Sequence, residues 1–447
     1  MNARPLDILL CSTPVHGHVT PLLAVSRALV DRGHRVHFLT GERYLERADA
    51  TGASVLRLPA EADYDDTDID AAFPGRVGLT GPAGIRWDMT EIFLRPARTQ
   101  LAAMDAVIRE LDIDVVLAES LFLGAALLAA RPPADRPALL NLGIVPLGVK
   151  SRDTAPFGLG VPPRPGALGR VRNAALTAIA EKIVFAPVQR AAQRIGQEAG
   201  TGLNGFVLDW PSHADGVVQF TVPEFEYPRA DVRVPIHFVG PVSRTQPSDT
   251  PLPAWWSDLD DGRPVVHVTQ GTVANRDPHD LILPTIHALA DQDVWVVAST
   301  GGRPVAELGA DLPRNARVAS YLPYDRLLPR TAVYVTNGGY GGIHYAMENG
   351  VPVVVAGTTE DKTEVSARVA WSGVGVKLPT NRPEPAAIAR AVRTVLDDPG
   401  YAERSAAIGR AIRASSGLDG LERAVVDTVR EAAATRPRRT STSPNRR

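Results

Sequence analysis

The sequence contains a single cysteine, few lysines and no long uninterrupted apolar run. With only Cys11 present, no intramolecular disulfide and no cysteine-based metal site can form. No stretch reaches the roughly 18 uncharged apolar residues that a membrane-spanning helix needs. The first residues also lack the basic-then-apolar order of a signal peptide. We therefore expect a cytoplasmic protein without a membrane span.

The net charge is small but unevenly distributed. The chain has 48 Lys and Arg against 50 Asp and Glu, which gives a net charge of −2. Residues 436–447 contain five arginines and no acid, so the remainder holds 43 basic and 50 acidic side chains. An acidic body disfavours nucleic-acid binding. We expect residues 434–447 to form a disordered basic tail, with binding of an acidic partner as the weaker alternative.

The length of 447 residues predicts about two domains. Asp7–Pro14, Val19–Gly33 and His34–Thr40 have the strand, helix and strand patterns with which a doubly wound parallel sheet begins, and a second such pattern starts at Pro264–Thr269. We therefore predict an α/β fold with two Rossmann-like parallel-sheet domains. The predicted segments are an N-terminal domain over 1–240, a linker over 241–262, a C-terminal domain over 263–416, and a helix over 417–433 that packs across to the first domain.

The segment Asp153–Arg170 is rich in Pro and Gly around Phe157 and Leu159. Such a composition cannot form one continuous element. It is compatible with an ordinary surface loop and equally with a mobile lid or acceptor-binding loop, because loops this long in a compact domain often carry function.

The turn VHGHVTP over 15–21 follows the first predicted strand. Ligands of open α/β sheets bind beyond the carboxyl ends of the strands, so His16 and His18 lie where a general base would be needed. A purely structural role is the alternative for a histidine at such a turn. Glu119 follows the predicted strand Asp114–Ala118 and can orient an imidazole, or can be an ordinary carboxylate at a helix start.

A second glycine turn, TNGGYGG over Thr336–Gly342, lies between a predicted strand and a helix. Its glycines allow close approach of a ligand to the backbone, and the helix N-terminus offers free N–H groups to an anion. The turn matches neither GxGxxG nor GxxxxGK[ST], which disfavours a dehydrogenase or a P-loop NTPase. A third turn over Thr269–Asn275 carries Gly271 and Thr272. Together the turns predict a nucleotide-type ligand between the domains.

Five segments in order resemble the large UDP/dTDP-glycosyltransferase family (family 1), which has the GT-B fold and modifies lipophilic small molecules. These segments are GHVTPLLAVSRALVDRGHRVHFLT near the N-terminus, FVGP at Phe238–Pro241, VHVTQGT at Val266–Thr272, ASYLPYDRLLP at Ala319–Pro329, and TNGGYGGIHYAMENGVPVVVAGTTEDKTE at Thr336–Glu364. The last is similar to the donor-binding signature of that family.

The resemblance implies roles for individual residues. His18 matches the general base, and Glu119 stands where the family usually has an Asp that orients it. Tyr321 matches the aromatic residue that stacks on the nucleotide base, and Asp361 matches the acid that binds sugar hydroxyls. The full set of expected donor-binding residues is Gly17, Thr272 (phosphate), Tyr321, Leu322 (base reading by its backbone), Asn337, Gly338, Gly339, Gly341, Gly342, Asp361 and Lys362.

Several positions depart from the family pattern. Asn337 replaces a phosphate-binding His, Gly342 a Ser or Thr, Tyr345 the acid that binds the ribose diol, and Lys362 a Gln beside the sugar-binding acid. Loss of the ribose-binding acid favours a dTDP donor slightly over UDP. Asn337 can still donate to a phosphate, and Lys362 can supply a positive charge. We expect His344 to be an exposed helix residue, with replacement of the missing phosphate-binding His as the alternative.

The resemblance thus implies an inverting, metal-independent glycosyltransferase that uses a dTDP- or UDP-sugar as co-substrate and needs no other cofactor. The expected acceptor is a hydroxyl of a lipophilic small molecule such as a polyketide or aromatic natural product. We expect a monomer or homodimer that binds no nucleic acid. Two alternatives stay open: a non-catalytic auxiliary member, which the altered donor motif favours and His18 opposes, and a nucleotide-sugar epimerase.

Overall fold

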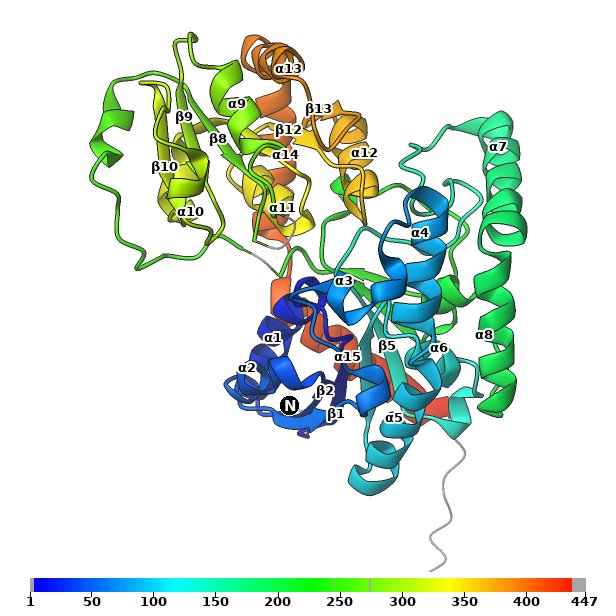
Figure 1. Cartoon of the computed structure of the whole chain (residues 1–447). Helices are drawn as coiled ribbons and strands as arrows, with labels where there is room; N and C mark the ends of the chain where they lie inside the picture. Colours follow the sequence, from blue (N-terminus) through cyan, green and yellow to red (C-terminus); the bar gives the residue numbers. More distant parts are fainter. Residues whose placement is uncertain (1–3, 243, 273–274, 436–447) are drawn as a thin grey trace, which may run out of the picture.

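The protein forms two parallel β-sheets, one in each half of the chain, in a computed structural model that describes residues 4–242, 244–272 and 275–435 (Figure 1). The first sheet has the strand order β3-β2-β1-β4-β5-β6-β7 and the second the order β10-β9-β8-β11-β12-β13. All neighbouring strands within each described sheet pair in parallel, as predicted. The first sheet contains β1 (Asp7–Cys11), β2 (Arg35–Thr40), β3 (Ser54–Arg57), β4 (Val115–Glu119), β5 (Ala138–Gly143), β6 (Gly216–Gln219) and β7 (Ile236–Phe238). The second contains β8 (Val265–Thr269), β9 (Trp295–Ser299), β10 (Ala316–Ala319), β11 (Thr331–Thr336), β12 (Val353–Ala356) and β13 (Gly375–Leu378).

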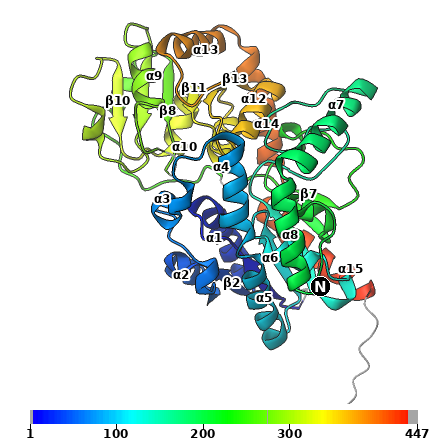
Figure 2. The same ribbon diagram turned by 45° about the vertical axis from the view of Figure 1, so that its right-hand side comes forward.

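Helices connect the strands and cover both faces of each sheet (Figures 1 and 2). Those of the first half are α1 (His16–Asp31), α2 (Leu45–Asp49), α3 (Ile69–Ala72), α4 (Gly81–Trp87), α5 (Ala97–Leu111), α6 (Gly124–Ala129), α7 (Gly166–Ile179) and α8 (Ala186–Glu198). Those of the second half are α9 (Ile282–Ala288), α10 (Tyr324–Leu327), α11 (Tyr340–Glu348), α12 (Lys362–Ser372), α13 (Pro385–Asp397), α14 (Gly400–Ala414) and α15 (Gly417–Thr435).

Alternating residues of the strands supply two separate cores around the first sheet. Leu9 and Cys11 of β1 face one side, where they join buried residues of α5 and α6. Ile8 and Leu10 face the other side, where they join buried residues of α1. Period-two alternation of side chains places neighbours on opposite faces of the sheet. The apolar run at 7–11 is therefore a strand buried on both faces, as in other doubly wound folds.

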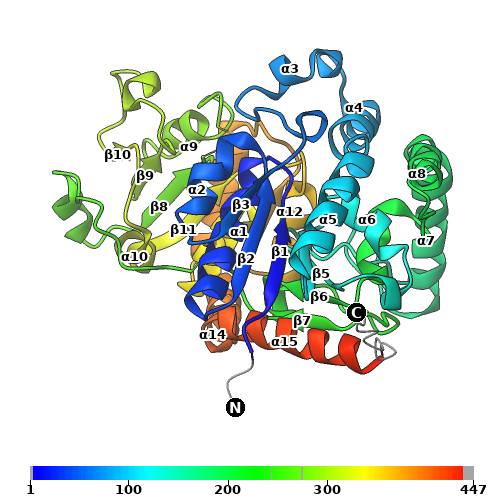
Figure 3. The ribbon, with the colours of Figure 1, turned by 90° about the horizontal axis from the view of Figure 1, so that it is seen from below.

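The last helix, α15, returns to the first sheet after the chain has completed the second (Figure 3). Leu421, Ala424 and Val425 of α15 belong to the same buried cluster as Leu10 of β1. The spacing of these three residues corresponds to one face of a helix. The chain thus crosses between the two halves twice, before β8 and before α15. The predicted tail over 434–447 lies outside the described residues from 436 onward.

The two halves also meet through a buried apolar contact. Phe225, which follows β6, lies in one cluster with Tyr340 and Ile343 of α11. The rings of Phe225 and Tyr340 are stacked with 6.5 Å between their centroids. Packing of this kind holds the strand ends of the first sheet close to α11 of the second.

Both sheets contain a point at which the strand order reverses. From β1 the chain builds outward to β2 and β3, then returns to place β4 on the other side of β1. In the second sheet the same reversal places β11 beside β8. Open α/β sheets bind ligands outside the carboxyl ends of the strands at such a switch point. The residues that follow β1, β4, β8 and β11 are therefore the expected site.

The predicted start of the first helix was wrong by three residues. The structure begins α1 at His16 rather than at Val19, so Gly17 and His18 lie in the first helical turn rather than in a preceding glycine turn. The bond from the Val19 N–H to the Val15 carbonyl oxygen, 2.9 Å long, closes this turn. Within the described residues, no helix is long and apolar enough to cross a membrane.

We expect Leu421→Ala to destabilise the protein strongly, because Leu421 is fully buried between α15 and the first sheet. Truncation of a buried leucine to alanine typically costs about 2–5 kcal/mol of unfolding free energy. Leu168→Ala on α7 is the matched control, since that leucine is 71 % exposed. Urea unfolding should show a reduced midpoint for Leu421→Ala only. Equal midpoints for both variants would contradict the packing of α15.

Candidate active site

A histidine and a glutamate from different elements meet at the switch point of the first sheet. His18 lies in the first turn of α1, and Glu119 is the last residue of β4. The Nδ1 atom of His18 lies 3.1 Å from Oε2 of Glu119. The Glu119 side chain has no exposure to solvent, whereas His18 keeps 15 % of its side chain exposed. The structure thus brings together the two residues that the sequence predicts as base and orienting acid.

Glu119 is held by several further hydrogen-bond donors. The Thr13 hydroxyl donates to Oε1 at 2.7 Å and the Thr13 N–H to the same oxygen at 3.2 Å. The Leu121 N–H donates to Oε2 at 2.6 Å. Burial alone would raise the pKa of Glu119, but His18 and these donors outweigh it and lower the pKa below its ordinary value. Glu119 is therefore a buried, ionised carboxylate.

The same contacts decide which nitrogen of His18 carries a proton. The Thr13 hydroxyl proton is directed to Glu119, so the contact of 3.2 Å between Thr13 Oγ1 and His18 Nδ1 needs the imidazole as donor. Nδ1–H therefore donates to Glu119, and Nε2 is left as the acceptor in the neutral ring. Burial lowers the pKa of His18, but the Glu119 charge and hydrogen bond overcome this effect and raise the pKa. A histidine tuned in this way can remove a proton near neutral pH.

The second switch point lies between β8 and β11. Asn337 follows β11, and its Nδ2 donates to the backbone oxygen of Gln270, which follows β8, at 2.7 Å. One amide hydrogen of Asn337 is thus directed to the backbone, in the place where the resemblance expects a phosphate ligand. Thr272 lies close behind Gln270 and is exposed. The two predicted phosphate turns therefore lie side by side.

The glycines at the start of α11 differ in what they contribute. Gly338 has φ of +90°, which disfavours other residues, and a Cβ there would lie 3.0 Å from Val355. A Cβ on Gly342 would lie 2.9 Å from the Tyr334 hydroxyl, so this position cannot hold the Ser or Thr of the family pattern without a shift. A Cβ on Gly339 would meet open space. Gly339 therefore leaves room beside the backbone.

The N-terminus of α11 provides backbone donors for an anion. Its first backbone bond of the i to i−4 type runs from the Ile343 N–H to the Gly339 carbonyl oxygen at 3.1 Å. The N–H groups of Tyr340, Gly341 and Gly342 precede that bond in the first turn. Donors at this position, together with the helix dipole, favour a bound phosphate.

Tyr321 and Leu322 follow β10 at the far side of the second sheet. Tyr321 is 58 % exposed and lies against Gly302, where a Cβ would collide with the Tyr321 hydroxyl. Leu322 is buried. An exposed aromatic ring with a glycine beneath it can accept a flat base on its other face. The positions expected to bind the nucleotide base thus lie on the same sheet as the phosphate turns.

Lys362 begins α12, after β12, and Asp361 is the N-cap residue of that helix. Burial is the main cause that raises the pKa of Asp361 to about 6, and the neighbouring Glu360 carboxylate adds to it, while Lys362 and His18 oppose it. The charge of Asp361 is in turn among the causes that raise the pKa of His18. Lys362 is buried, and its Nζ pairs with Glu360 at 2.9 Å. The positive charge expected at Lys362 is thus already neutralised by a neighbour.

The expectation for His344 was wrong. His344 is only 1 % exposed, its Nδ1 donates to the Tyr340 carbonyl oxygen at 2.8 Å, and its Nε2 lies 2.7 Å from the Thr221 hydroxyl. Burial lowers its pKa to about 4, so it is neutral at physiological pH. His344 therefore links α11 to the first domain rather than facing solvent. Tyr345, one residue on, packs its ring edge-on to that of Tyr324 with 5.7 Å between centroids.

Comparisons with known proteins agree with this geometry. Residues 284–416 match the family model described as the erythromycin biosynthesis protein CIII-like C-terminal domain. The chain is 41 % identical over 406 residues to 4'-demethylrebeccamycin synthase of Lentzea aerocolonigenes, covering 90 % of this chain and 93 % of that protein. It is 33 % identical to UDP-glycosyltransferase 2 of Phaeomoniella chlamydospora, covering 97 % of both chains. The chain belongs to the family 1 glycosyltransferases.

Solved structures of natural-product glycosyltransferases have the same GT-B fold. The kitacinnamycin glycotransferase superposes with a TM-score of 0.69 at 25 % identity, covering 96 % of this chain and 99 % of that chain. The calicheamicin glycosyltransferase CalG4 also has a TM-score of 0.69, at 22 % identity, and covers 96 % of this chain and all of its own. This glycosyltransferase thus has the predicted fold and belongs with enzymes of the natural-product type.

Several residues of the glycosyltransferase site were not anticipated from the sequence. Thr13 bonds Glu119 and contacts His18, and Phe93 stacks on the His18 ring with 6.2 Å between centroids. Glu360 has φ of +54°, a left-handed conformation that costs a non-glycine residue roughly 1–2 kcal/mol. Thr13 could have been found from its place just after β1, and Phe93 from the apolar residues over Trp87–Phe93, a range that ends with it, whereas nothing local distinguishes Glu360. Among the described residues, no group of three His, Cys, Asp or Glu side chains is placed to hold a metal ion.

We expect Glu119→Gln to lower the pKa of His18, because the carboxylate charge and its hydrogen bond raise that pKa. NMR titration of the imidazole C–H resonances measures this shift directly. His16 is the internal control, because burial is the main cause of its lowered pKa and Glu119 is not among the groups that influence it. An unchanged His18 pKa in Glu119→Gln would show that Glu119 does not set its protonation.

Proposed function

We propose that this glycosyltransferase transfers a sugar from a dTDP- or UDP-linked donor to a hydroxyl of a lipophilic small molecule, with inversion at the anomeric carbon. The observation that carries the proposal is the His18–Glu119 pair, in which the buried Glu119 holds the imidazole through Nδ1 and leaves Nε2 as the acceptor. A base on one side and a sugar-binding carboxylate on the other suit an acceptor and a donor that meet between the domains.

In the proposed reaction His18 Nε2 removes the proton from the acceptor hydroxyl while that oxygen attacks the anomeric carbon. The bond between this carbon and the diphosphate oxygen breaks, and the nucleoside diphosphate leaves with the electron pair. Glu119 holds the ring through Nδ1 and stabilises the imidazolium that forms. Attack from the side opposite to the leaving group inverts the anomeric configuration.

We propose that the leaving diphosphate is bound by the backbone N–H groups at the start of α11, without a metal ion. Two features support this: the helix N-terminus, and the open space beside Gly339. Donors that are held in place before reaction stabilise the negative charge as it develops. This arrangement does not depend on a His at position 337 or on a Ser or Thr at position 342.

The identity of donor and acceptor is part of the proposal. The names of several relatives, such as UDP-glucosyltransferase B1 of Starmerella bombicola at 31 % identity, support a nucleotide-sugar donor. Tyr345 stands where the family has the acid that binds the ribose diol. The deoxyribose of dTDP has no 2′-hydroxyl and so no such diol, and the replacement therefore favours a dTDP donor. The relative 4'-demethylrebeccamycin synthase supports an acceptor of the natural-product class. The altered donor motif alone favours a non-catalytic member, but the complete His18–Glu119 pair opposes that alternative.

We expect His18→Ala to reduce kcat by roughly 10²–10⁴-fold, the usual contribution of a general base, while the donor still binds. Turnover can be followed by acceptor-dependent release of nucleoside diphosphate, and donor binding by calorimetry. His16→Ala is the matched control, because it removes a histidine of the same helical turn whose N–H bonds Asp66 and which does not contact Glu119. Near-wild-type turnover in His18→Ala would refute the base assignment.

We expect the donor KM to rise as the pH falls through about 6, because Asp361 titrates there. Its raised pKa means that the carboxylate is charged above this pH and becomes protonated below it. A protonated acid accepts sugar hydroxyl bonds less well than a carboxylate. Asp361→Asn should show a raised donor KM that is independent of pH between 5 and 7. A wild-type donor KM that does not change over this range would contradict the role of Asp361.

A further inference from the structure

A segment of the first domain reaches across to α12 of the second. In the stretch that precedes α7, the N–H groups of Gly158 and Gly160 donate to Oε1 of Glu364 at 2.9 and 2.8 Å. Glu364 lies in the first turn of α12 and is only 4 % exposed. Figures 1 and 2 both show the chain before α7 extending toward α12. A surface loop would not be fastened by a buried carboxylate of another domain.

The contact is so close that only glycine fits at one position. Gly160 has φ of +58°, and a Cβ there would lie 2.7 Å from Cγ2 and 2.9 Å from the carbonyl oxygen of Thr363. Thr363 is the residue before Glu364. The backbone of the segment therefore lies directly on the first turn of α12, with no side chain between them.

The other oxygen of Glu364 is held from behind by a buried arginine. Arg368, one turn further along α12, donates from Nη1 to Oε2 of Glu364 at 2.7 Å. It also donates to both carboxylate oxygens of Glu226 in the first domain, each at 2.9 Å, and is completely buried. Removal of one of these buried charged side chains would leave the charge of its partner without compensation, which is strongly destabilising. Glu364 therefore cannot turn away from the segment without losing Arg368.

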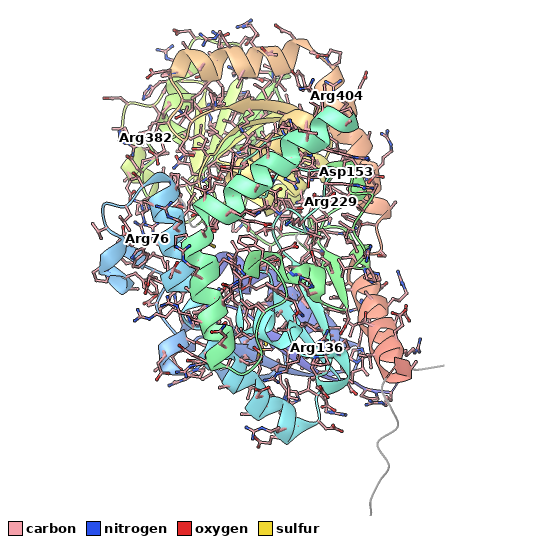
Figure 4. All side chains as sticks on the ribbon, turned by 90° about the vertical axis from the view of Figure 1, so that its right-hand side faces the viewer. Arg76, Arg136, Asp153, Arg229, Arg382 and Arg404 are labelled. Carbon is pink, nitrogen blue, oxygen red and sulfur yellow. The ribbon has the colours of Figure 1, made fainter. Side chains whose placement is uncertain are left out.

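The beginning of the segment is fixed to the first domain. Asp153 accepts the Ala230 N–H at 3.1 Å and pairs with Arg170 of α7 at 3.0 Å. Arg229, beside Ala230, donates to the Val149 carbonyl oxygen at 3.0 Å. Figure 4 shows Asp153 and Arg229 close together near the junction of the two domains. Arg172 of α7 also donates to the Pro162 carbonyl oxygen at 3.0 Å, so the tip between these two fixed points is fastened to the second domain by Glu364.

The tip lies beside the predicted sugar site. The Glu364 N–H donates to the carbonyl oxygen of Asp361 at 2.9 Å, so both residues belong to one helical turn. Phe157 and Leu159, which flank Gly158, keep 40 % and 45 % of their surface exposed. Apolar side chains that remain partly exposed here are available to a lipophilic acceptor.

We propose that Glu364 is a positioning residue that fastens the tip over Gly158–Gly160 to α12 and thereby forms the wall of the acceptor site beside Asp361. This role rests on the proposed glycosyl transfer. The hydrogen bonds from Gly158 and Gly160 join this segment of the first domain to α12, which directly follows Asp361. A segment held in this position excludes water and orders the acceptor.

Hydrogen exchange tests the contact without the need for activity. The Gln side chain in Glu364→Gln has a single amide oxygen. That oxygen can accept a hydrogen bond from the two glycine N–H groups or from Arg368, but the variant no longer has one charged oxygen for the glycines and another for Arg368. We expect faster exchange of the Gly158 and Gly160 amides than in the wild type. Glu403→Gln, an exposed residue of α14, makes the same change of charge and should leave that exchange unaltered. Unchanged exchange in Glu364→Gln would overturn the proposal.

A second pair of variants leaves the ion pairs intact. Gly160→Ala should displace the tip from Thr363, whereas Gly166→Ala has a similar positive φ of +83° but meets open space. With UDP-glucose or dTDP-glucose and the best acceptor from a panel of aromatic and polyketide alcohols, we expect kcat/KM for the acceptor to fall roughly 10–100-fold in Gly160→Ala. The donor KM should stay within about twofold, since Asp361 is unchanged.

The outcomes separate the positioning role from the proposed function. Wild-type kcat/KM for the acceptor in a folded Gly160→Ala, with an unchanged thermal midpoint, would overturn the positioning role. A fall of the same size in the acceptor kcat/KM of Gly166→Ala would also overturn the positioning role, because backbone strain alone would then explain the effects of both substitutions. No transfer by the wild type with any donor and acceptor would refute the proposed function, while the exchange experiment would still decide whether Glu364 holds the tip.

Discussion

Parallel strands all end at the same edge of a sheet, and this constraint gathers the site of the protein from separate parts of the chain. His18 follows β1 and Glu119 ends β4, which are neighbours at the point where the strand order reverses. The turns after β8 and β11 are neighbours for the same reason, joined by the bond from Asn337 to Gln270. Phe225, which follows β6, stacks on Tyr340 of α11, so the strand-end edge of the first sheet lies against the second domain.

Buried carboxylates determine how the parts of this site are held. A carboxylate removed from water must be compensated by donors or by an opposite charge. Glu119 is compensated by Thr13, Leu121 and His18, which orients the imidazole as a consequence. Glu226 and Glu364 are compensated by Arg368, which joins the two domains as a consequence. The same physical requirement thus orients His18 and positions α12 relative to the first domain.

The donor side is less dependent on charged side chains than the family pattern suggests. The charge of Lys362 is paired with Glu360, and the side chain of Asn337 is an uncharged amide that donates to the Gln270 carbonyl oxygen. Backbone N–H groups at the start of α11 carry the capacity to bind an anion, and Tyr334 makes Gly342 the residue that fits there. An acidic body can still bind a diphosphate, because a helix N-terminus concentrates oriented donors at one point.

Local patterns in the sequence were sufficient for the fold and for the placement of His18 and Glu119 at neighbouring strand ends, while the roles of the site residues stay predictions. Apolar runs followed by glycine turns indicate buried parallel strands, and the carboxyl ends of such strands place His18, Glu119 and the glycines of α11 without further information. The tertiary structure alone decided the burial of His344 against Thr221, because both faces of α11 are covered, one by its own sheet and one by the first domain. It alone brought Gly158 to Glu364, 206 positions away, and Glu226 to Arg368, 142 positions away. The physical reason is that periodicity records which side of an element is buried, whereas partners across a domain interface depend on how two completed sheets pack.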